Sequence, residues 1–391
     1  MRGEKEKVRI VGVTPIYPSA SRPSYGAFVK NIFEGMVTAG GTVTVVSPVS
    51  WVQFAGDAIN RTKTEVPVAQ GITTYRPLYT SVSARLLPWG DLGMKLTSVL
   101  FGREVRRTLM KVTGNVDFAY AHFFTAGAAC IDWCEDNQVD SILALGESNI
   151  ADVEKLHGAR SFRTVLERFS GVIAVSKSIE DFCRRCSPTL GERLSYIPNA
   201  VNTDVFRPRL KRDCRDRLGL PVEGRIAVFV GHFLQRKGSL RVLEAIEKIP
   251  GLKGIFLGSG SSAQTPRGPS VLRAAPVVNE DMPLWLCASD VFVLPSLAEG
   301  MSNAVLEAMA CGLPLVVSDR TFNREFLAED CAAFVDPESV ESIAEGLRRC
   351  LRDEKTNRRM AKAALVRSEA FTIAGRIDAI LEFYHRVRRC R

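Results

Sequence analysis

Two acidic residues, Glu299 and Glu307, lie in a segment whose pattern is that of a loop followed by a short helix. Ser302 can cap that helix, and Gly312 supplies its stop. A carboxylate repels phosphate but forms strong charge-assisted hydrogen bonds with hydroxyl groups, so sugar or ribose hydroxyls are its expected partners. On spacing alone, the interpretation that both glutamates are surface acids is favoured. Spacing by itself therefore makes them candidates only.

The segment also lies between two buried apolar runs, Val291–Leu294 and Leu315–Val317, which predict neighbouring strands. A helix that starts at the carboxyl end of a parallel strand directs unpaired amides and its positive dipole end toward an anion. Ligands of open α/β sheets bind beyond those strand ends. We therefore expect the amides at Ser302 and Asn303 to bind a diphosphate, with one glutamate in the loop and the other about two turns down the helix.

A second loop, Gly231–Ser239, also joins a buried run to a helix start. It contains Arg236 and Lys237, whose cations suit phosphate oxygens. A solvated lysine at a helix entrance is the plainer interpretation of the Lys-Gly pair. The second loop is thus a candidate for holding the same anion.

Alternating apolar runs and helical patterns predict two α/β domains, each with a parallel sheet covered by helices on both faces. The length of 391 residues agrees with two domains. The predicted strands are Arg9–Thr14, Val43–Ser47, Val116–Tyr120, Ile142–Leu145, Val172–Val175, Ile226–Val230, Ile255–Leu257, Val291–Leu294 and Leu315–Val317. Helices are predicted through Phe28–Met36, from about Ser239 and over Ala374–Arg389. The Pro- and Asn-rich stretch Tyr196–Asn202 is predicted to join the domains.

Charge and cysteine content restrict the partners. The net charge of +9 comes from basic excesses in residues 1–110 and 350–391, which suit an anionic membrane, nucleic acid or substrate, or a merely solvated surface. The ten cysteines have no zinc-type spacing, so reduced thiols and no metal site are expected. The chain contains no run of about 18 apolar residues, and Pro15 breaks the first apolar run, so neither a membrane span nor an export signal is expected.

The segment from Pro295 to Pro314 resembles the signature of the retaining group 1 glycosyltransferases, a family with the GT-B fold. The resemblance covers nearly the whole chain and is closest from Tyr196 to Ser318. It implies two Rossmann-like parallel-sheet domains facing a central cleft. The implied parts are an acceptor-side domain at 1–198, a nucleotide-sugar-binding domain at 199–371, and a helix at 372–391 that crosses back to the first domain.

The resemblance also implies roles for single residues. Glu299 matches the family's glutamate that contacts the donor sugar, and Glu307 matches the one that holds the ribose. His232 stands where the family usually has arginine; because histidine carries no permanent charge, we expect Arg236 to take over. The implied catalytic residues are His122, Lys237 and Glu299, and the implied donor-binding residues are Gly26, Gly231, His232, Arg236, Gly258, Gly300, Met301, Ser302, Asn303 and Glu307. Without the resemblance, His122 beside aromatic residues would be interpreted as a packed core histidine.

The function implied is transfer of a sugar from a nucleotide-diphosphate donor to a glycan or lipid-linked acceptor, by same-face attack and without a metal or other cofactor. A cytoplasmic location is expected, with a peripheral position at the inner face of the membrane as an option, and no nucleic-acid partner. The stretch Trp51–Arg107 mixes aromatic and basic residues as an anionic membrane interface would, although core aromatics under a basic surface explain it equally. The alternatives are a sugar-nucleotide 2-epimerase and a non-catalytic binding protein on the same fold, and acceptor-dependent nucleotide release separates all three.

Overall fold

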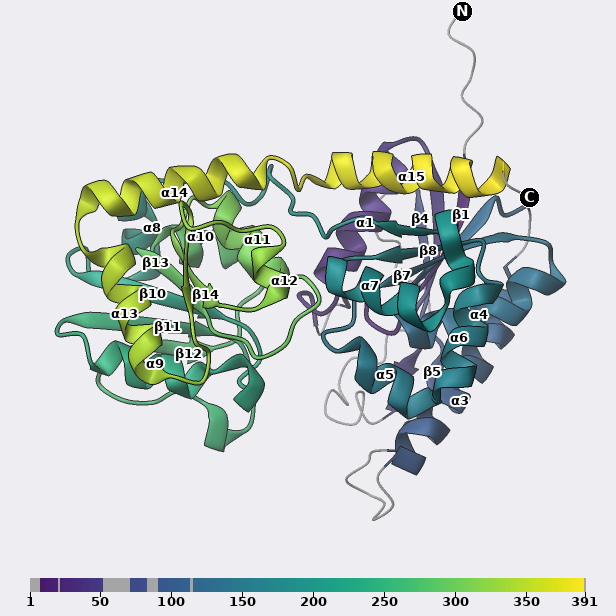
Figure 1. The fold of residues 1–391 in the computed structure, drawn as a ribbon, viewed down its shortest axis with the longest axis horizontal. Coiled ribbons are helices and arrows are strands. Elements are labelled where there is room, and N and C mark those ends of the chain that lie inside the picture. Colours follow the sequence, from purple (N-terminus) through teal and green to yellow (C-terminus); the bar gives the residue numbers. More distant parts are fainter. Residues whose placement is uncertain (1–7, 20–21, 52–70, 83–90, 113–114, 390–391) are drawn as a thin grey trace, which may run out of the picture. The chain divides into compact units, whose positions relative to one another are not determined.

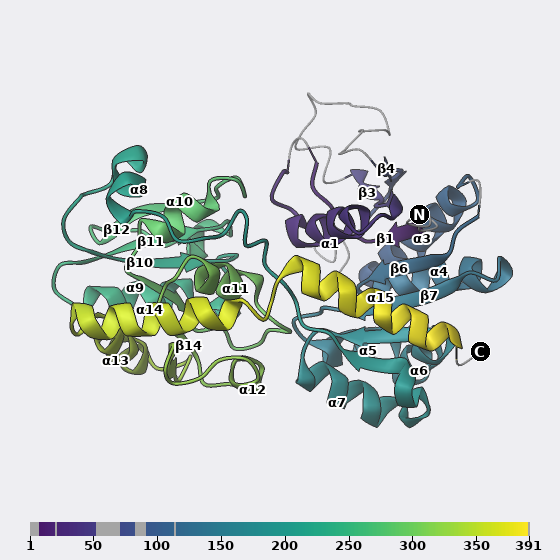
Figure 2. The ribbon, with the colours of Figure 1, turned by 90° about the horizontal axis from the view of Figure 1, so that it is seen from above.

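The computed structural model describes residues 8–19, 22–51, 71–82, 91–112 and 115–389. The chain folds into two compact units, Met1–Pro198 with Arg376–Arg391, and Asn199–Gly375 (Figure 1). Each unit has its own parallel sheet with helices on its faces, which Figure 2 shows from a second direction. The two Rossmann-like sheets predicted from the sequence are confirmed.

The first unit contains a seven-stranded sheet in the order β4-β2-β1-β6-β7-β8-β9, with every neighbouring pair parallel. Its strands are β1 (Arg9–Val13), β2 (Thr42–Val46), β4 (Ile72–Tyr75), β6 (Phe118–His122), β7 (Asp140–Leu145), β8 (Gly171–Ala174) and β9 (Leu194–Tyr196). Its helices are α1 (Ala27–Thr38), α3 (Asp91–Leu109), α4 (Phe124–Asp136), α5 (Ile150–His157), α6 (Ala159–Arg168), α7 (Lys177–Cys186) and most of α15 (Ile373–Arg389). A 3₁₀ segment (Pro188–Arg193) and a small parallel pair, β3 (Val49–Ser50) with β5 (Leu78–Tyr79), complete it.

The second unit contains a six-stranded parallel sheet in the order β12-β11-β10-β13-β14-β15, the strand order of a dinucleotide-binding Rossmann sheet. Its strands are β10 (Arg225–Val230), β11 (Leu252–Leu257), β12 (Val271–Ala275), β13 (Val291–Leu294), β14 (Leu315–Ser318) and β15 (Ala332–Val335). Its helices are α8 (Lys211–Leu218), α9 (Ser239–Glu247), α10 (Met282–Cys287), α11 (Asn303–Ala310), α12 (Thr321–Arg324), α13 (Val340–Leu351) and α14 (Glu354–Ser368). Short 3₁₀ turns lie at Gln235–Lys237 and Ser262–Gln264.

Helix α15 packs on the first sheet through its aromatic residues. The Tyr384 ring stacks on Phe118 of β6 with 4.4 Å between ring centroids, and its hydroxyl donates to the Asp117 carbonyl at 3.3 Å. Phe383 lies against Gly171 of β8, where a Cβ would stand 2.6 Å from the ring. The buried Arg376 donates to the carbonyls of Ile197 and Pro198. Helix α15 is thus fixed to the first unit from Arg376 onward.

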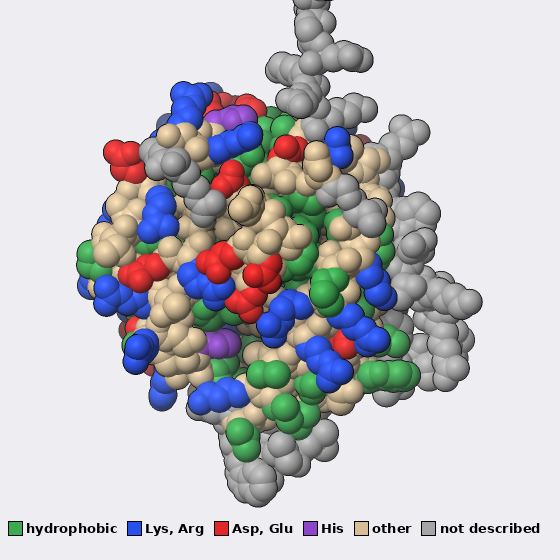
Figure 3. All heavy atoms as spheres, turned by 90° about the vertical axis from the view of Figure 1, so that its right-hand side faces the viewer, with side chains coloured by type: hydrophobic (Ala, Val, Ile, Leu, Met, Phe, Trp, Pro, Cys, Tyr) green, Lys and Arg blue, Asp and Glu red, His purple; other side chains and the backbone are tan. Residues whose placement is uncertain are grey.

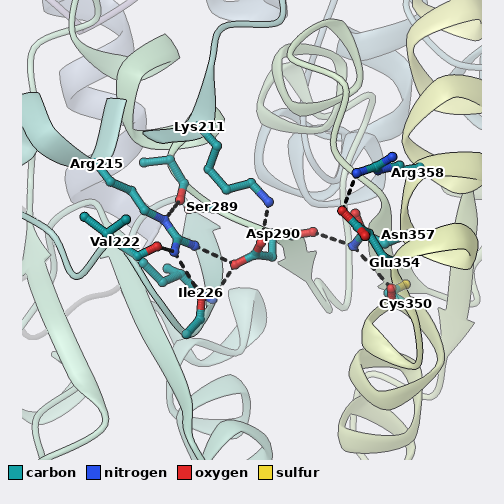
Figure 4. A network of polar contacts seen from close by, with 12 residues as sticks. Lys211, Arg215, Val222, Ile226, Ser289, Asp290, Cys350, Glu354, Asn357 and Arg358 are labelled. Carbon is teal, nitrogen blue, oxygen red and sulfur yellow. Dashed lines mark hydrogen bonds and ion pairs between the residues drawn. The ribbon is translucent and has the colours of Figure 1, made fainter. Parts of the chain in front are cut away.

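A polar network ties the amino ends of β10 and β13 together (Figure 4). The buried Arg215 donates to Asp290 Oδ2 at 2.7 Å and to the Ala288 carbonyl at 2.8 Å. Asp290 Oδ2 also accepts the Ile226 amide at 2.8 Å, and Lys211 pairs with Oδ1. Because this network lies at the amino ends of the strands, away from their ligand-binding ends, its role is structural.

We expect Arg215→Ala to lower the free energy of unfolding by about 3–5 kcal/mol, because it leaves the Asp290 carboxylate largely buried without its main partner. Arg212→Ala, a change at an exposed position of the same helix, should cost within about 0.5 kcal/mol. Urea unfolding of both variants measures the difference. Equal losses in the two variants would show that the network contributes little.

Candidate active site

The two loops singled out from the sequence follow paired strands of the second unit. We call Gly231–Gly238, after β10, the lysine loop, and Pro295–Ser302, after β13, the glutamate loop. Strands β10 and β13 are parallel neighbours, with Ala227 opposite Val291. Since carboxyl ends of neighbouring parallel strands lie at one edge of a sheet, the fold brings both loops to the ligand-binding edge.

Direct contacts fasten the two loops to each other. The Leu297 amide donates to the Arg236 carbonyl at 2.8 Å, and Arg236 Nη1 donates to the Ala298 carbonyl at 3.0 Å. Gly238 has a φ of 81°, and a Cβ there would stand 3.1 Å from Pro295 Cγ. Glycine at 238 thus meets both a left-handed backbone and a close neighbour. The loops form one polar surface.

The central contact of this surface is an ion pair between Lys237 Nζ and Glu299 Oε1. The two side chains are only 13% and 7% exposed, respectively, so both charges are largely removed from water. The cation assigned to phosphate and the carboxylate assigned to sugar are therefore each other's partners. A diphosphate that attracts Lys237 would release the Glu299 carboxylate for a hydroxyl.

Helix α11 begins at Asn303, directly after the glutamate loop, and its last residue is Ala310. Ser302 occupies the N-cap position, but its hydroxyl caps no amide, so the predicted side-chain cap is wrong. The Ser302 side chain is buried, and only its backbone carbonyl joins the helix, by accepting the Leu306 amide at 3.3 Å. The helix stops before Gly312, whose φ of 70° is left-handed, as the sequence predicted.

Two buried polar atoms in the glutamate loop and the first turn of α11 have no hydrogen-bond partner in the described part of the chain. They are Asn303 Oδ1, in the first turn of α11, and Ser296 Oγ, in the glutamate loop. Buried polar atoms without partners are uncommon in folded proteins and call for an explanation such as a missing ligand or water. The position of Asn303 at the amino end of α11 agrees with the binding role predicted for it.

Glu307 lies four residues after Asn303, about one helical turn into α11 and not the two turns predicted. Burial raises the pKa of its carboxyl to about 8, and no cation in the described part of the chain offsets that effect. The side chain is nevertheless partly solvent-accessible, so a ligand can reach it. At neutral pH the ligand-free protein holds this carboxyl mainly in its protonated form.

Asn199 is a site residue that the sequence analysis did not identify. Its side-chain amide donates to the Met301 carbonyl at 3.0 Å, and its backbone amide lies 3.2 Å from Met301 Sδ. These bonds hold the glutamate loop beside Gly300 from a buried position. The Pro-Asn pattern at this place was interpreted only as a domain joint, although a polar residue between apolar neighbours was a usable signal.

The other residues of the second unit that were predicted to bind the donor lie in or next to the lysine loop. The Gly231 carbonyl approaches Gly258 so closely that a Cβ at 258 would stand 1.9 Å from it, which gives Gly258 a packing role. The His232 side chain is exposed, and Arg236 is partly buried. A donor role for each of these residues remains a prediction.

In the first unit, His122 ends β6 and is fully buried among aromatic rings, with Phe123 at 4.6 Å and Phe28 at 5.4 Å between centroids. Burial and the nearby Arg376 lower the pKa of its imidazole to about 3, so the ring is neutral. Neither ring nitrogen has a hydrogen-bond partner among the described residues. Its predicted catalytic role stays a prediction, and its packing agrees with a core position.

Glu147, two residues after β7, is a second group that the sequence analysis did not select. Its Oε1 accepts the Phe124 amide at the start of α4, and burial raises its pKa to about 7. Phe123, the residue directly before Phe124, has φ 74° and ψ 149°, a backbone conformation that glycine alone adopts easily. The carboxyl ends of β6 and β7 thus carry a buried acid and a strained backbone.

Gly26 begins α1 with a φ of 78°, and a Cβ there would stand 2.8 Å from the Ile16 carbonyl. A side chain at this position would therefore clash with backbone and strain the turn. The structure gives Gly26 this conformational role, and its contact with donor or acceptor remains a prediction.

Among the described residues, no group of three or more His, Cys, Asp or Glu side chains is placed to hold a metal ion. The nine described cysteines are free thiols, and all except the partly exposed Cys186 are buried. No helix within the described ranges is long and apolar enough to cross a membrane.

We expect Arg236→Ala to raise the donor KM at least about tenfold, and His232→Ala to change it by less than about threefold, because a bond to a charged group contributes about 1.5–3 kcal/mol. Arg236 lies within the joined loops, whereas His232 extends into solvent. Steady-state kinetics on both variants decide between them, with melting temperatures as the control for loop damage. A larger effect at His232 would show that the residue at the family's usual arginine position, and not Arg236, binds the diphosphate.

Comparison with solved structures identifies the fold. The fold is similar to that of a sucrose-phosphate synthase from Thermosynechococcus elongatus, with a TM-score of 0.79 at 18% identity over 98% of this chain and 100% of that one. It is also similar to HepE of Anabaena in complex with UDP and glucose, with a TM-score of 0.72 at 17% identity over 96% and 98% of the two chains. The fold is GT-B, as the resemblance predicted.

The sequence comparisons extend the similarity beyond the fold. Residues 211–367 match the family model described as glycosyl transferases group 1. A Bacillus subtilis protein named as a teichuronic acid biosynthesis glycosyltransferase, TuaC, is 27% identical over 354 residues, which cover 88% of this chain and 89% of that protein. D-inositol 3-phosphate glycosyltransferases of Mycobacterium tuberculosis are 34% identical over 141 residues, 32% of this chain and 29% of theirs. The chain is thus similar in sequence to the group 1 glycosyltransferases, and the resemblance stated from the sequence is confirmed.

Proposed function

We propose that this glycosyltransferase moves a sugar, with retention of configuration, from a nucleoside diphosphate to a hydroxyl of a glycan or lipid-linked acceptor in polysaccharide or glycoconjugate biosynthesis. The observation that carries the proposal is the Lys237–Glu299 pair on two joined loops, beside the uncapped start of α11. The name of TuaC, for teichuronic acid biosynthesis, and that of HepE in complex with UDP and glucose support the acceptor and donor classes.

The chemistry assigned to these groups is same-face attack. The bond from the anomeric carbon to the diphosphate oxygen breaks while the acceptor oxygen bonds to that carbon on the same face. The acceptor's proton passes to the departing phosphate oxygen. Lys237, Arg236 and the amides at the start of α11 stabilise the negative charge that grows on the leaving group. Glu299, released from Lys237, holds a hydroxyl of the transferred sugar.

The test begins with a thermal-shift screen of UDP-, GDP- and ADP-sugars, because a ligand at about 100 times its Kd adds about 2.7 kcal/mol of stability. Release of nucleoside diphosphate from the stabilising donor is then measured with and without acceptor. Release that requires acceptor supports transfer. Release without acceptor would indicate a 2-epimerase, and binding without release a non-catalytic protein.

We expect transfer to proceed without a divalent metal, since Lys237 and the α11 amides occupy the charge-neutralising role and Glu299 and Glu307 are assigned to hydroxyls. A bound magnesium ion usually needs one or two protein carboxylates of its own. The measurement is the initial rate of metal-stripped protein in excess chelator, which should stay within about twofold of the untreated rate. Complete loss, restored by magnesium or manganese, would overturn the charge assignment.

The proposed location is the cytoplasm, with a peripheral position at the inner face of the membrane where a lipid-linked acceptor would be presented. The basic excess of the chain is assigned to anionic lipid and donor rather than to nucleic acid. In the stretch that suggested a membrane interface, Phe54, Arg61, Lys63, Arg85 and Trp89 lie outside the described residues. Within the described part of that stretch, α3 is the element that can present such a surface.

A further inference from the structure

Helix α3 of the first unit buries one side in the usual way. Phe101, Val105 and Leu109, spaced four residues apart, are almost completely buried. Phe101 meets the Tyr79 ring of β5 at 5.6 Å between centroids, and Gly102 faces Ala129 of α4. This side holds α3 to the body of the unit.

The opposite side of α3 is exposed and largely apolar. Its residues recur every three or four positions and so share one stripe along the helix. They are Leu92, Leu96, Val99, Arg103, Arg106 and, just after the helix, Met110. The exposed fractions reach 63% at Val99 and 72% at Met110. The solvent face of a surface helix is ordinarily polar, so four apolar residues out of these six require a partner.

Basic residues surround the apolar part of this stripe. Lys95 and Arg103 are exposed and form no ion pair within the described ranges. Arg106 forms an ion pair with the exposed Asp132 at 3.0 Å, and Arg107 forms one with Glu104 at 3.8 Å. These acids offset only part of the positive charge of the helix. Figure 3 shows hydrophobic side chains gathered on the lower part of the face where α3 lies, with Lys and Arg side chains next to them.

We propose that the outer stripe of α3 docks on an anionic lipid bilayer, with its apolar side chains in the interface and Lys95, Arg103 and Arg107 against lipid phosphates. An apolar helix face combined with basic residues whose charge is only partly offset by acids fits that surface. A second copy of the chain is disfavoured, because a two-fold interface would place these cations against each other. The proposal rests on the proposed function, whose lipid-linked acceptor would be held at such a surface.

The test is co-sedimentation of the full chain with vesicles of phosphatidylcholine alone and of phosphatidylcholine mixed equally with phosphatidylglycerol. We expect at least about tenfold stronger binding to the anionic vesicles, weakened by salt. Val99→Glu and Leu96→Glu should each reduce that binding at least about tenfold. Val366→Glu is the matched control, because Val366 on α14 is also an exposed valine, at 56%, with Lys362 and Arg367 nearby in sequence.

Equal binding to both vesicle types, or equal effects of Val99→Glu and Val366→Glu, would overturn the proposal. So would a dimer in gel filtration that Val99→Glu dissociates while vesicles stay unbound. The thermal shift by the nucleotide sugar and transfer to a soluble acceptor are measured on the same variants. Loss of vesicle binding with intact transfer separates this proposal from the proposed function, which fails only if transfer is absent from the wild-type protein.

Discussion

Glu299→Ala is expected to reduce transfer at least about a hundredfold while leaving the Kd of the free nucleoside diphosphate within about threefold. The loss follows because a preorganised group acting on the reacting sugar typically contributes that much to kcat. The affinity is kept because Lys237, no longer paired with Glu299, stays available to the diphosphate. Isothermal titration with the nucleoside diphosphate and rate measurements on the same preparation give both quantities.

Glu299→Gln is the matched variant, because it keeps the shape of the side chain and removes its charge. It should also transfer poorly and bind the nucleoside diphosphate at least as well as the wild-type protein. Loss of nucleotide binding by a variant at 299, with binding kept by Glu307→Ala, would contradict the assignment of Glu299 to the sugar and Glu307 to the ribose.

Glu307→Ala should weaken nucleotide binding at least about tenfold, because the ribose hydroxyls lose a charge-assisted acceptor. The wild-type affinity should also depend on pH. The ligand-free carboxyl has a pKa of about 8, and hydroxyl donors favour its ionised form. Binding near neutral pH therefore releases close to one proton, and the affinity rises up to about tenfold per pH unit until about pH 8.

Glu307→Gln separates this effect from other titrating groups, including the phosphate of the ligand. Titrations in buffers of different ionisation enthalpy should show less proton release by this variant than by the wild-type protein. The same pKa, raised from 4.5 to about 8, means that the folded state binds more protons than the unfolded state between those values, so the free energy of unfolding falls as pH rises through that window. Identical proton release in both proteins would show that Glu307 does not meet the ligand in its ionised form.

The central strands of both sheets were predictable because they are buried on both faces and read as continuous apolar runs. Strand β13 was predicted with its observed bounds, Val291–Leu294, and β10 differs by one residue. Strand β6 begins at Phe118, two residues later than predicted, and ends at His122, where the pairing with β7 ends. The edge strands of both sheets, β4, β9, β12 and β15, were missed. Strand β12 is partly exposed along its whole length and so lacks the apolar run.

Spacing could identify the candidate loops but not the contacts between them. Lys237 and Glu299 are 62 residues apart, and only the neighbouring positions of β10 and β13 bring them together. The Ser302 cap was predicted from residue type, whereas side-chain burial decides where the hydroxyl lies. The raised pKa of Glu147 arises from burial that no local pattern records.

The most direct test of the account is acceptor-dependent release of nucleoside diphosphate by the wild-type protein and Glu299→Gln. The reaction contains the nucleotide sugar that gives the largest thermal shift, with or without a solvent extract of bacterial lipid-linked glycans. The account predicts release by the wild-type protein only when the extract is present, and release at least about a hundredfold slower by Glu299→Gln. Release that ignores the extract, or that is equally fast in Glu299→Gln, would contradict sugar transfer at the Lys237–Glu299 site.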